Sequence, residues 1–155
     1  MGRYVPLFET RKRVGLGTQP WRQSIADIYW ENIEKGEKIA NAYNADYLAF
    51  FQPVVYYDES QGEYVGGGDT LDGRAEASQH FSKTRKLIVG HDKKSNADYF
   101  FDISEVYYGH KEAYVDFIHT KQQWKHIVVD SIAGQVLNKM EQIMQAKNAT
   151  SLSSN

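Results

Sequence analysis

Two short runs of apolar residues constrain the fold of this chain more than any other feature of its sequence. Residues 46–57 are nearly all apolar over the length of a strand, and residues 99–103 form a second, shorter run. Such runs are typical of parallel strands whose two faces are both covered. Pro53 lacks a backbone N–H, so we expect regular pairing of the first strand to stop there.

Helical patterns surround the two runs. Apolar residues recur every three to four positions over residues 21–43, 74–89 and 121–145. Pro20 stands where a helix can begin, and Gly36 is expected to cost the first helix up to ~1 kcal/mol relative to alanine. Helices that alternate with buried strands predict an α/β fold with parallel strands.

Two strands do not make a complete sheet. A two-stranded parallel sheet cannot hide both of its faces or satisfy both of its edges, and an isolated strand pair is marginally stable in water. We therefore expect the remaining strands to come from a missing N-terminal half or from an oligomer partner that completes the sheet.

The length and composition favour one folded unit. The 155 residues fall within the usual size of one domain, and 41% of them are apolar, which is enough for a packed core. We predict an irregular segment over residues 1–20, one α/β unit over residues 21–146 and a disordered tail over residues 147–155. Residues 58–73 are rich in glycine and predict a loop.

The composition also argues against several classes of function. A net charge of −2 gives no broad basic surface, so we expect no nucleic-acid partner. The absence of cysteine excludes thiolate zinc sites and a cysteine nucleophile. No run reaches the about 18 apolar residues that a membrane-spanning helix needs, so no membrane span is expected. The sequence points to no particular compartment.

One acid and one imidazole stand close together between the second strand and the last helix. Asp116 precedes His119 by three residues, and loops in this position of an α/β sheet lie where ligands bind. A carboxylate that accepts from one ring nitrogen fixes the tautomer, which leaves the other nitrogen to take a proton from a hydroxyl. By spacing alone, the simpler interpretation is an aspartate that caps the last helix beside a solvent-facing histidine.

The order of several segments resembles the C-terminal half of SGNH (GDSL-type) ester hydrolases over residues 21–145. The segments that carry the resemblance are YLAFFQPV (47–54) after a helix at 29–43, FFDISEVY (100–107), YVDFIH (114–119) and the helix at 127–136. The resemblance implies a partial flavodoxin-like three-layer α/β/α fold with parallel strands. It also implies that His119 is a general base and Asp116 its orienting partner. Gln52 would line the substrate site, although a strand-end amide that bonds the backbone is the simpler interpretation.

The chain departs from the family where the nucleophile should be. The Gly-Asp-Ser block, the oxyanion glycine and the Gly-x-Asn-Asp block normally precede the matched segments, and residues 1–20 contain none of them. Residues 68–70 read Gly-Asp-Thr, but they stand in the wrong order and in a glycine-rich loop, so we interpret them as coincidence. Trp124 replaces a glycine that is common in the family. We therefore expect the isolated chain to be inactive or nearly so.

Three functions follow as alternatives. The first is the C-terminal part of a serine ester hydrolase that acts on a small-molecule ester, with an acylated carbohydrate suggested by the tyrosines near the site. The second is a degenerate, non-catalytic α/β module that binds a partner or small ligand. The third, a nucleotide binder, lacks a glycine-rich loop between a strand and a helix. We expect neither a cofactor nor a metal, because the remaining histidines form no ligand-like group: His80, His91, His110 and His126.

Overall fold

The computed structural model describes residue 11 and residues 13–57, 74–116 and 118–152. The regular elements are α2 (Gln19–Ala42), β1 (Ala49–Phe51), α3 (Arg74–Val89), β2 (Phe100–Asp102) and α4 (Lys125–Leu152). Short 3-10 turns stand between them: η1 (Val55–Tyr57), η4 (Asp92–Asn96), η5 (Lys111–Ala113) and η6 (Gln122–Trp124). The predicted loop at 58–73, with its Gly-Asp-Thr triplet, lies outside the described residues.

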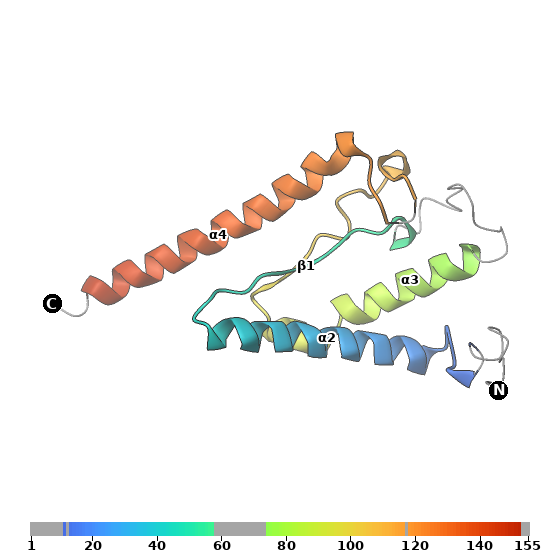
Figure 1. The fold of residues 1–155 in the computed structure, drawn as a ribbon, viewed down its shortest axis with the longest axis horizontal. Coiled ribbons are helices and arrows are strands. Elements are labelled where there is room, and N and C mark those ends of the chain that lie inside the picture. The colour runs from blue at the N-terminus through green and yellow to red at the C-terminus, as the bar shows by residue number, and fades with distance from the viewer. Residues whose placement is uncertain (1–10, 12, 58–73, 117, 153–155) are drawn as a thin grey trace, which may run out of the picture.

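The two predicted strands pair in parallel, as the apolar runs indicated. Ala49 is opposite Phe100 and Phe51 is opposite Asp102, and α3 lies between the two strands in the chain. The first strand is much shorter than predicted. It ends two residues before Pro53, and the apolar residues beyond it turn into η1 instead of continuing the sheet. In Figure 1 the strands lie between α2 and α4, with α3 beside α2.

Trp30 of α2 centres the core on one face of the sheet. Its side chain is fully buried, its ring centroid lies 4.6 Å from that of Phe100, and its indole N–H donates to the carbonyl oxygen of Ile88 at 2.8 Å. Ala49 and Phe51 belong to the same cluster. Ala49, Phe51 and Phe100 face α2 and α3 with apolar side chains, and Asp102 on the same face pairs with Arg85 of α3 at 2.9 Å, so the two helices close this face of the sheet.

Gly36 is more than a weak point in α2. A Cβ at this position would stand 2.6 Å from the hydroxyl oxygen of Tyr47. The glycine therefore lets the ring of Tyr47 approach the helix, and its cost in helix propensity accompanies a packing role.

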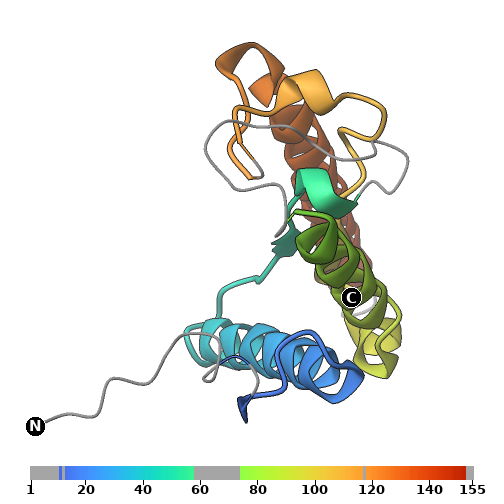
Figure 2. The same cartoon turned by 90° about the vertical axis from the view of Figure 1, so that its right-hand side faces the viewer.

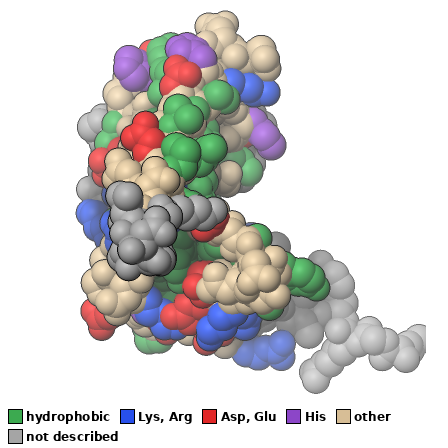
Figure 3. All heavy atoms as spheres, turned by 90° about the vertical axis from the view of Figure 1, so that its left-hand side faces the viewer, with side chains coloured by type: hydrophobic (Ala, Val, Ile, Leu, Met, Phe, Trp, Pro, Cys, Tyr) green, Lys and Arg blue, Asp and Glu red, His purple; other side chains and the backbone are tan. Residues whose placement is uncertain are grey.

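The opposite face of the sheet is less covered. Phe50 and Phe101 stack there with ring centroids 5.5 Å apart, and both are only partly buried. The helix on this side, α4, is tied to the start of β2 by an ion pair of 2.7 Å between Lys139 and Asp98. Large apolar residues of α4 remain exposed, namely Val129, Leu137, Met140 and Met144. Figure 3 shows hydrophobic side chains open to the surface in the hollowed middle of the face seen from the C-terminal end of α4.

A second core lies beyond the carboxyl ends of the strands. Tyr107 and Tyr114 are buried and pack edge to face at 5.5 Å, and Tyr56 is buried in the same cluster. Trp124 of η6 and Ile127 of α4 pack against it. These three tyrosines therefore build the core under the predicted site, and they are not open to a sugar.

Both ends of the chain contain more helix than predicted. At the N-terminal end, Arg11 and Arg13 are helical and the side chain of Thr18 caps α2, so residues 1–20 are not irregular throughout. At the other end, α4 continues to Leu152, and the prediction of a disordered tail from residue 147 is wrong as far as residue 152. Alanine and lysine at 146–149 favour helix, which allows the amphipathic segment to extend.

No helix in the described ranges is both long enough and apolar enough to cross a bilayer.

Candidate active site

The loop that carries Asp116 and His119 is closed at its base. An isolated antiparallel bridge joins Tyr114 to Thr120, the N–H of Val115 donates to the carbonyl oxygen of His119 at 2.7 Å, and the N–H of Lys121 donates to that of Ala113 at 2.8 Å. These backbone bonds bring the two ends of the segment together. The acid and the imidazole therefore lie at the tip of a short closed loop between β2 and α4.

Asp116 binds His119 directly. The carboxylate Oδ2 lies 2.6 Å from Nδ1 of the ring. The other oxygen, Oδ1, accepts the backbone N–H of Ile118 at 3.0 Å and that of His119 at 2.7 Å. The predicted juxtaposition is confirmed, and so is part of the simpler interpretation, because the same carboxylate also caps backbone donors of the loop.

These bonds fix the charge and the tautomer of the pair. The side-chain bond to His119, followed by the two backbone N–H donors, lowers the pKa of Asp116 from its ordinary value to about 2. The carboxylate is thus ionised at neutral pH and requires Nδ1 to be the protonated nitrogen. Nε2 has no hydrogen-bond partner among the described residues. In the neutral ring it is therefore an available proton acceptor.

The pair is open to solvent. The side chain of His119 is 74% exposed and that of Asp116 is 43% exposed. Below the loop, the hydroxyl of Tyr107 donates to the carbonyl oxygen of Trp124 at 2.7 Å. The loop is thus held from its buried side, while the reactive nitrogen stays accessible to a second molecule.

Gln52 is not brought to this pair by any bond in the described part of the chain. It follows the last residue of β1 and its side chain is exposed. Its role in binding substrate stays a prediction.

A charged network that sequence reasoning missed lies at the carboxyl end of β2. Arg85 of α3 donates to Oγ of Ser104 at 2.6 Å and to the carboxylates of Asp102 at 2.9 Å and Glu105 at 2.6 Å. Asp102 and Ser104 also form a turn, since the backbone N–H of Ser104 donates to the carboxylate of Asp102 at 3.0 Å. One signal could have revealed the network: Arg85 lies on the buried face of α3, three residues before Ile88.

Ser104 is not placed to serve as a nucleophile. Its side chain is buried, its hydroxyl donates to Asp102 at 2.6 Å, and its oxygen accepts the N–H of Arg85. Both hydrogen-bonding roles of the hydroxyl are in use, so Ser104 is a structural residue of the turn.

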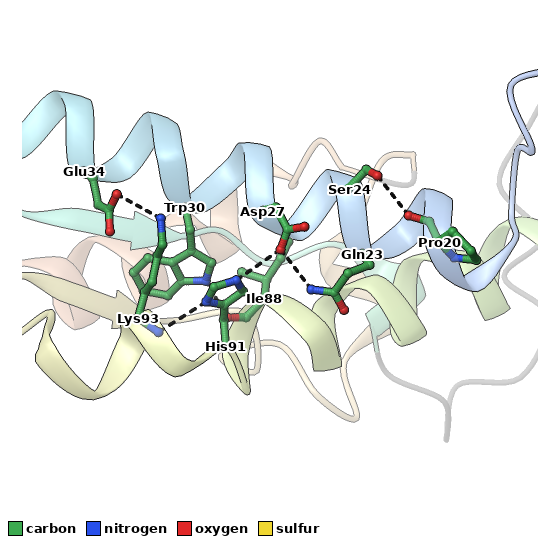
Figure 4. Close-up of polar contacts among 9 residues, drawn as sticks. All are labelled: Pro20, Gln23, Ser24, Asp27, Trp30, Glu34, Ile88, His91 and Lys93. Atoms are coloured by element: carbon green, nitrogen blue, oxygen red, sulfur yellow. Dashed lines mark hydrogen bonds and ion pairs between the residues drawn. The ribbon is translucent and has the colours of Figure 1, made fainter.

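A second carboxylate–imidazole pair joins α2 to η4, and Figure 4 shows its residues. Nε2 of His91 lies 3.2 Å from Oδ1 of Asp27, and Nδ1 of the same ring accepts the backbone N–H of Lys93 at 3.2 Å. The ring packs 5.8 Å from that of Trp30, and its side chain is 15% exposed. A bond from Gln23, and then the bond to His91, lowers the pKa of Asp27. The sequence pattern had assigned no role to His91.

The other histidines also have partners. His110 pairs with Glu112 at 3.1 Å, and Nδ1 of His126 donates to the carbonyl oxygen of Gln123 at 2.9 Å. Nδ1 of His80 lies 3.3 Å from the guanidinium of Arg22. Within the described ranges, no group of three or more histidines and acids could hold a metal ion.

Comparisons with known proteins give this chain no relative. No protein-family model matches it, and neither a curated protein nor a solved structure matches it. The role of the site therefore has to be argued from its own geometry.

Proposed function

We propose that this chain provides the general base of a serine ester hydrolase and is the C-terminal part of the catalytic unit. The observation that carries the proposal is the 2.6 Å bond between Asp116 and Nδ1 of His119, with Nε2 exposed and without a partner in the described chain. An ionised carboxylate on one ring nitrogen and an accessible second nitrogen are what proton abstraction from a hydroxyl requires.

In this proposal His119 moves one proton in each half of the reaction. Nε2 takes the proton of a serine hydroxyl as its oxygen attacks the ester carbonyl carbon. The imidazolium, stabilised by Asp116, then gives that proton to the alcohol that leaves, and an acyl-enzyme remains. Water repeats the cycle and releases the carboxylic acid.

The serine and the oxyanion donors have to come from a polypeptide segment outside the described residues. Strands from that segment would extend the β1–β2 pair toward a flavodoxin-like three-layer sheet, with α2 and α3 on one side and α4 on the other. The mixed helix and strand content and the parallel pairing support this fold at the coarse level. The buried tyrosines do not support a sugar in particular, so the proposed substrate is a small-molecule carboxylic ester.

Reconstitution tests the proposal. Residues 1–155 are expressed alone and in frame with the coding sequence immediately upstream, and hydrolysis of p-nitrophenyl acetate is measured. We expect activity only in the longer product, with a loss on the order of 10²–10⁴-fold in Asp116→Asn or His119→Gln. His126→Gln is the matched control, because His126 is also exposed but its Nδ1 bonds only a backbone carbonyl. Activity that survives His119→Gln contradicts the proposal.

The second candidate is a non-catalytic module that binds a partner or small ligand. It is favoured by one observation: in the described part of the chain no hydroxyl bonds Nε2 of His119, and the buried Ser104 is fully engaged. An upstream coding sequence that lacks a Gly-Asp-Ser segment, together with a longer product that is inactive, would favour this module over the hydrolase.

A further inference from the structure

The outer edge of β1 has no backbone partner in the described chain. The N–H of Ala49 donates to Tyr99 at 2.8 Å and the carbonyl of Phe51 accepts from Ile103 at 3.2 Å, so these residues turn their backbone groups toward β2. Because successive residues of a strand direct their backbone N–H and carbonyl groups to opposite sides, those of residues 48, 50 and 52 point away from β2. No hydrogen bond is formed by those outward groups among the described residues. Figure 2 shows β1, in teal, at the margin of the fold with α3 on its other side.

This edge also lacks the features that normally prevent pairing with another chain. Lysine, other charges and proline commonly protect edge strands, yet residues 48–52 read Leu-Ala-Phe-Phe-Gln. Pro53 does not protect the edge, because its position in the alternation turns its nitrogen toward β2. The edge is thus able to accept a strand along its whole length.

The outer edge of β2 differs. The N–H of Phe100 donates to the carbonyl oxygen of Ala97 at 3.0 Å, inside the turn before the strand. Asp102 is the next residue whose backbone faces outward, and its carboxylate forms an ion pair of 2.9 Å with the guanidinium of Arg85. One outward donor is in use and the strand ends in a charged network, so β1 is the edge that is left for a partner.

We propose that β1 pairs with β1 of a second copy of this chain, antiparallel and across a two-fold axis at Phe50. The outward groups are self-complementary in this arrangement. Phe50 exchanges its N–H and carbonyl bonds with its own counterpart, and Leu48 does so with Gln52 of the other copy. The product is one sheet in the order β2-β1-β1-β2. It passes the three strands that an independently stable sheet needs.

The side chains favour the same arrangement. Phe50 stacks on Phe101 at 5.5 Å on the less covered face of the sheet. Pairing across the axis would place the two Phe50 rings side by side and produce a continuous row of four aromatic rings. Aromatic cross-strand pairs contribute roughly 0.2–1 kcal/mol each relative to alanine pairs. No like charges meet at the axis, since residues 48–52 are uncharged.

This inference concerns residues 1–155 by themselves: in the longer product of the proposed hydrolase, an upstream strand would take the same edge of β1 and replace the second copy. A second copy completes the sheet and brings a second Asp116–His119 pair, but it brings no Gly-Asp-Ser block. The esterase assay and the state of association are separate measurements, so either proposal can fail alone.

The test measures mass and amide exchange on residues 1–155. Light scattering coupled to gel filtration is expected to give twice the 17.8 kDa of one chain. In hydrogen exchange followed by NMR, the Phe50 amide should be protected in the dimer and exchange at least tenfold faster on dilution below the dissociation constant. The Ala49 amide, which bonds β2, is expected to stay protected at both concentrations.

Two variants locate the interface. Phe50→Lys sets two like charges across the axis, and Gln52→Pro removes an outward N–H at an exposed position; both should give monomers. Phe101→Lys is the control, because it breaks the same ring stack while lying on β2, and it should still associate. Three results overturn the proposal: a monomer with an unprotected Phe50 amide at every concentration, a dimer that is lost only in Leu137→Glu of α4, or protection of Phe50 that requires a different polypeptide.

Discussion

The chain holds two carboxylate–imidazole pairs whose surroundings differ. In the Asp27–His91 pair both ring nitrogens are bonded, one to the carboxylate and one to the backbone N–H of Lys93. The ring packs beside Trp30, and the side chain of His91 is 15% exposed. In the Asp116–His119 pair only Nδ1 is bonded and the ring is 74% exposed. The first pair joins residues 64 apart in the chain, whereas the second joins residues three apart.

The difference shows that the same two groups can be fully engaged within the fold in one place and leave a ring nitrogen open in the other. Nδ1 of His91 accepts the Lys93 N–H, so in the neutral ring the hydrogen is on Nε2, which faces Asp27, and a proton on Nδ1 would end the bond to Lys93. His119 has the opposite tautomer, and a proton on its Nε2 breaks no bond within the described chain. Protonation of the neutral ring therefore breaks a hydrogen bond at His91, whereas at His119 it breaks none within the described residues.

The largest expected effect separates the two pairs by stability. His91→Ala should lower the free energy of unfolding by about 1–3 kcal/mol, because it leaves Asp27 and the start of η4 without their partner and opens space beside Trp30. His119→Ala should leave the free energy of unfolding nearly unchanged, since an exposed pair contributes little. Urea denaturation of the two variants beside the unchanged chain measures both. Equal losses would mean that the division between a structural and a reactive pair is wrong.

An intermediate effect concerns the charge of Asp116. Its pKa of about 2 lies below the ordinary value of 3.8, so the ionised carboxylate favours the folded loop. That contribution is complete above the unfolded value near 3.8 and is lost as the pH falls through about 2. Carbon-13 NMR of the carboxyl group should give a midpoint near 2, and His119→Ala should move it up toward the ordinary range. A midpoint that the variant leaves unchanged would remove the side-chain bond as the main cause.

The smallest expected effect is a difference between the two histidine rings in their nitrogen-15 spectra. At a pH where both rings are neutral, nitrogen-15 correlation spectra should assign the hydrogen to Nδ1 in His119 and to Nε2 in His91. Asp116→Asn should allow the His119 ring to populate both tautomers, while the His91 signals stay as they were. Identical tautomers at the two sites would contradict the bonding roles on which the contrast is built.

The sequence predicted the helices well because their signals are local. The pattern over 74–89 matches α3 at both ends, and the stripe that begins at Trp21 identified α2 within two residues of its start. It predicted the positions of the strands but not their lengths. Whether an apolar residue such as Val55 continues a strand or turns into a 3-10 helix depends on what packs against it, and a single chain's pattern does not contain that information.

Gly36 and Arg85 show the same limit at single positions. Each is unfavourable by local rules, one in a helix interior and one on a buried helix face. The ring of Tyr47 explains the first, and Asp102, Ser104 and Glu105 explain the second. Departures from local preference thus marked tertiary contacts without revealing the partners.

The sequence by itself determined that Asp116 and His119 meet: an acid three residues before an imidazole lies within reach of it, since a short closed loop leaves few arrangements. Tertiary structure alone decided which histidines are structural, because His91 meets Asp27 only after α2 and η4 pack together. It also decided that β1 ends at Phe51 and that its outer edge has no strand partner among the described residues. Local bonds can be read from spacing, whereas pairing across 50 or more residues depends on the free energy of the whole packed chain.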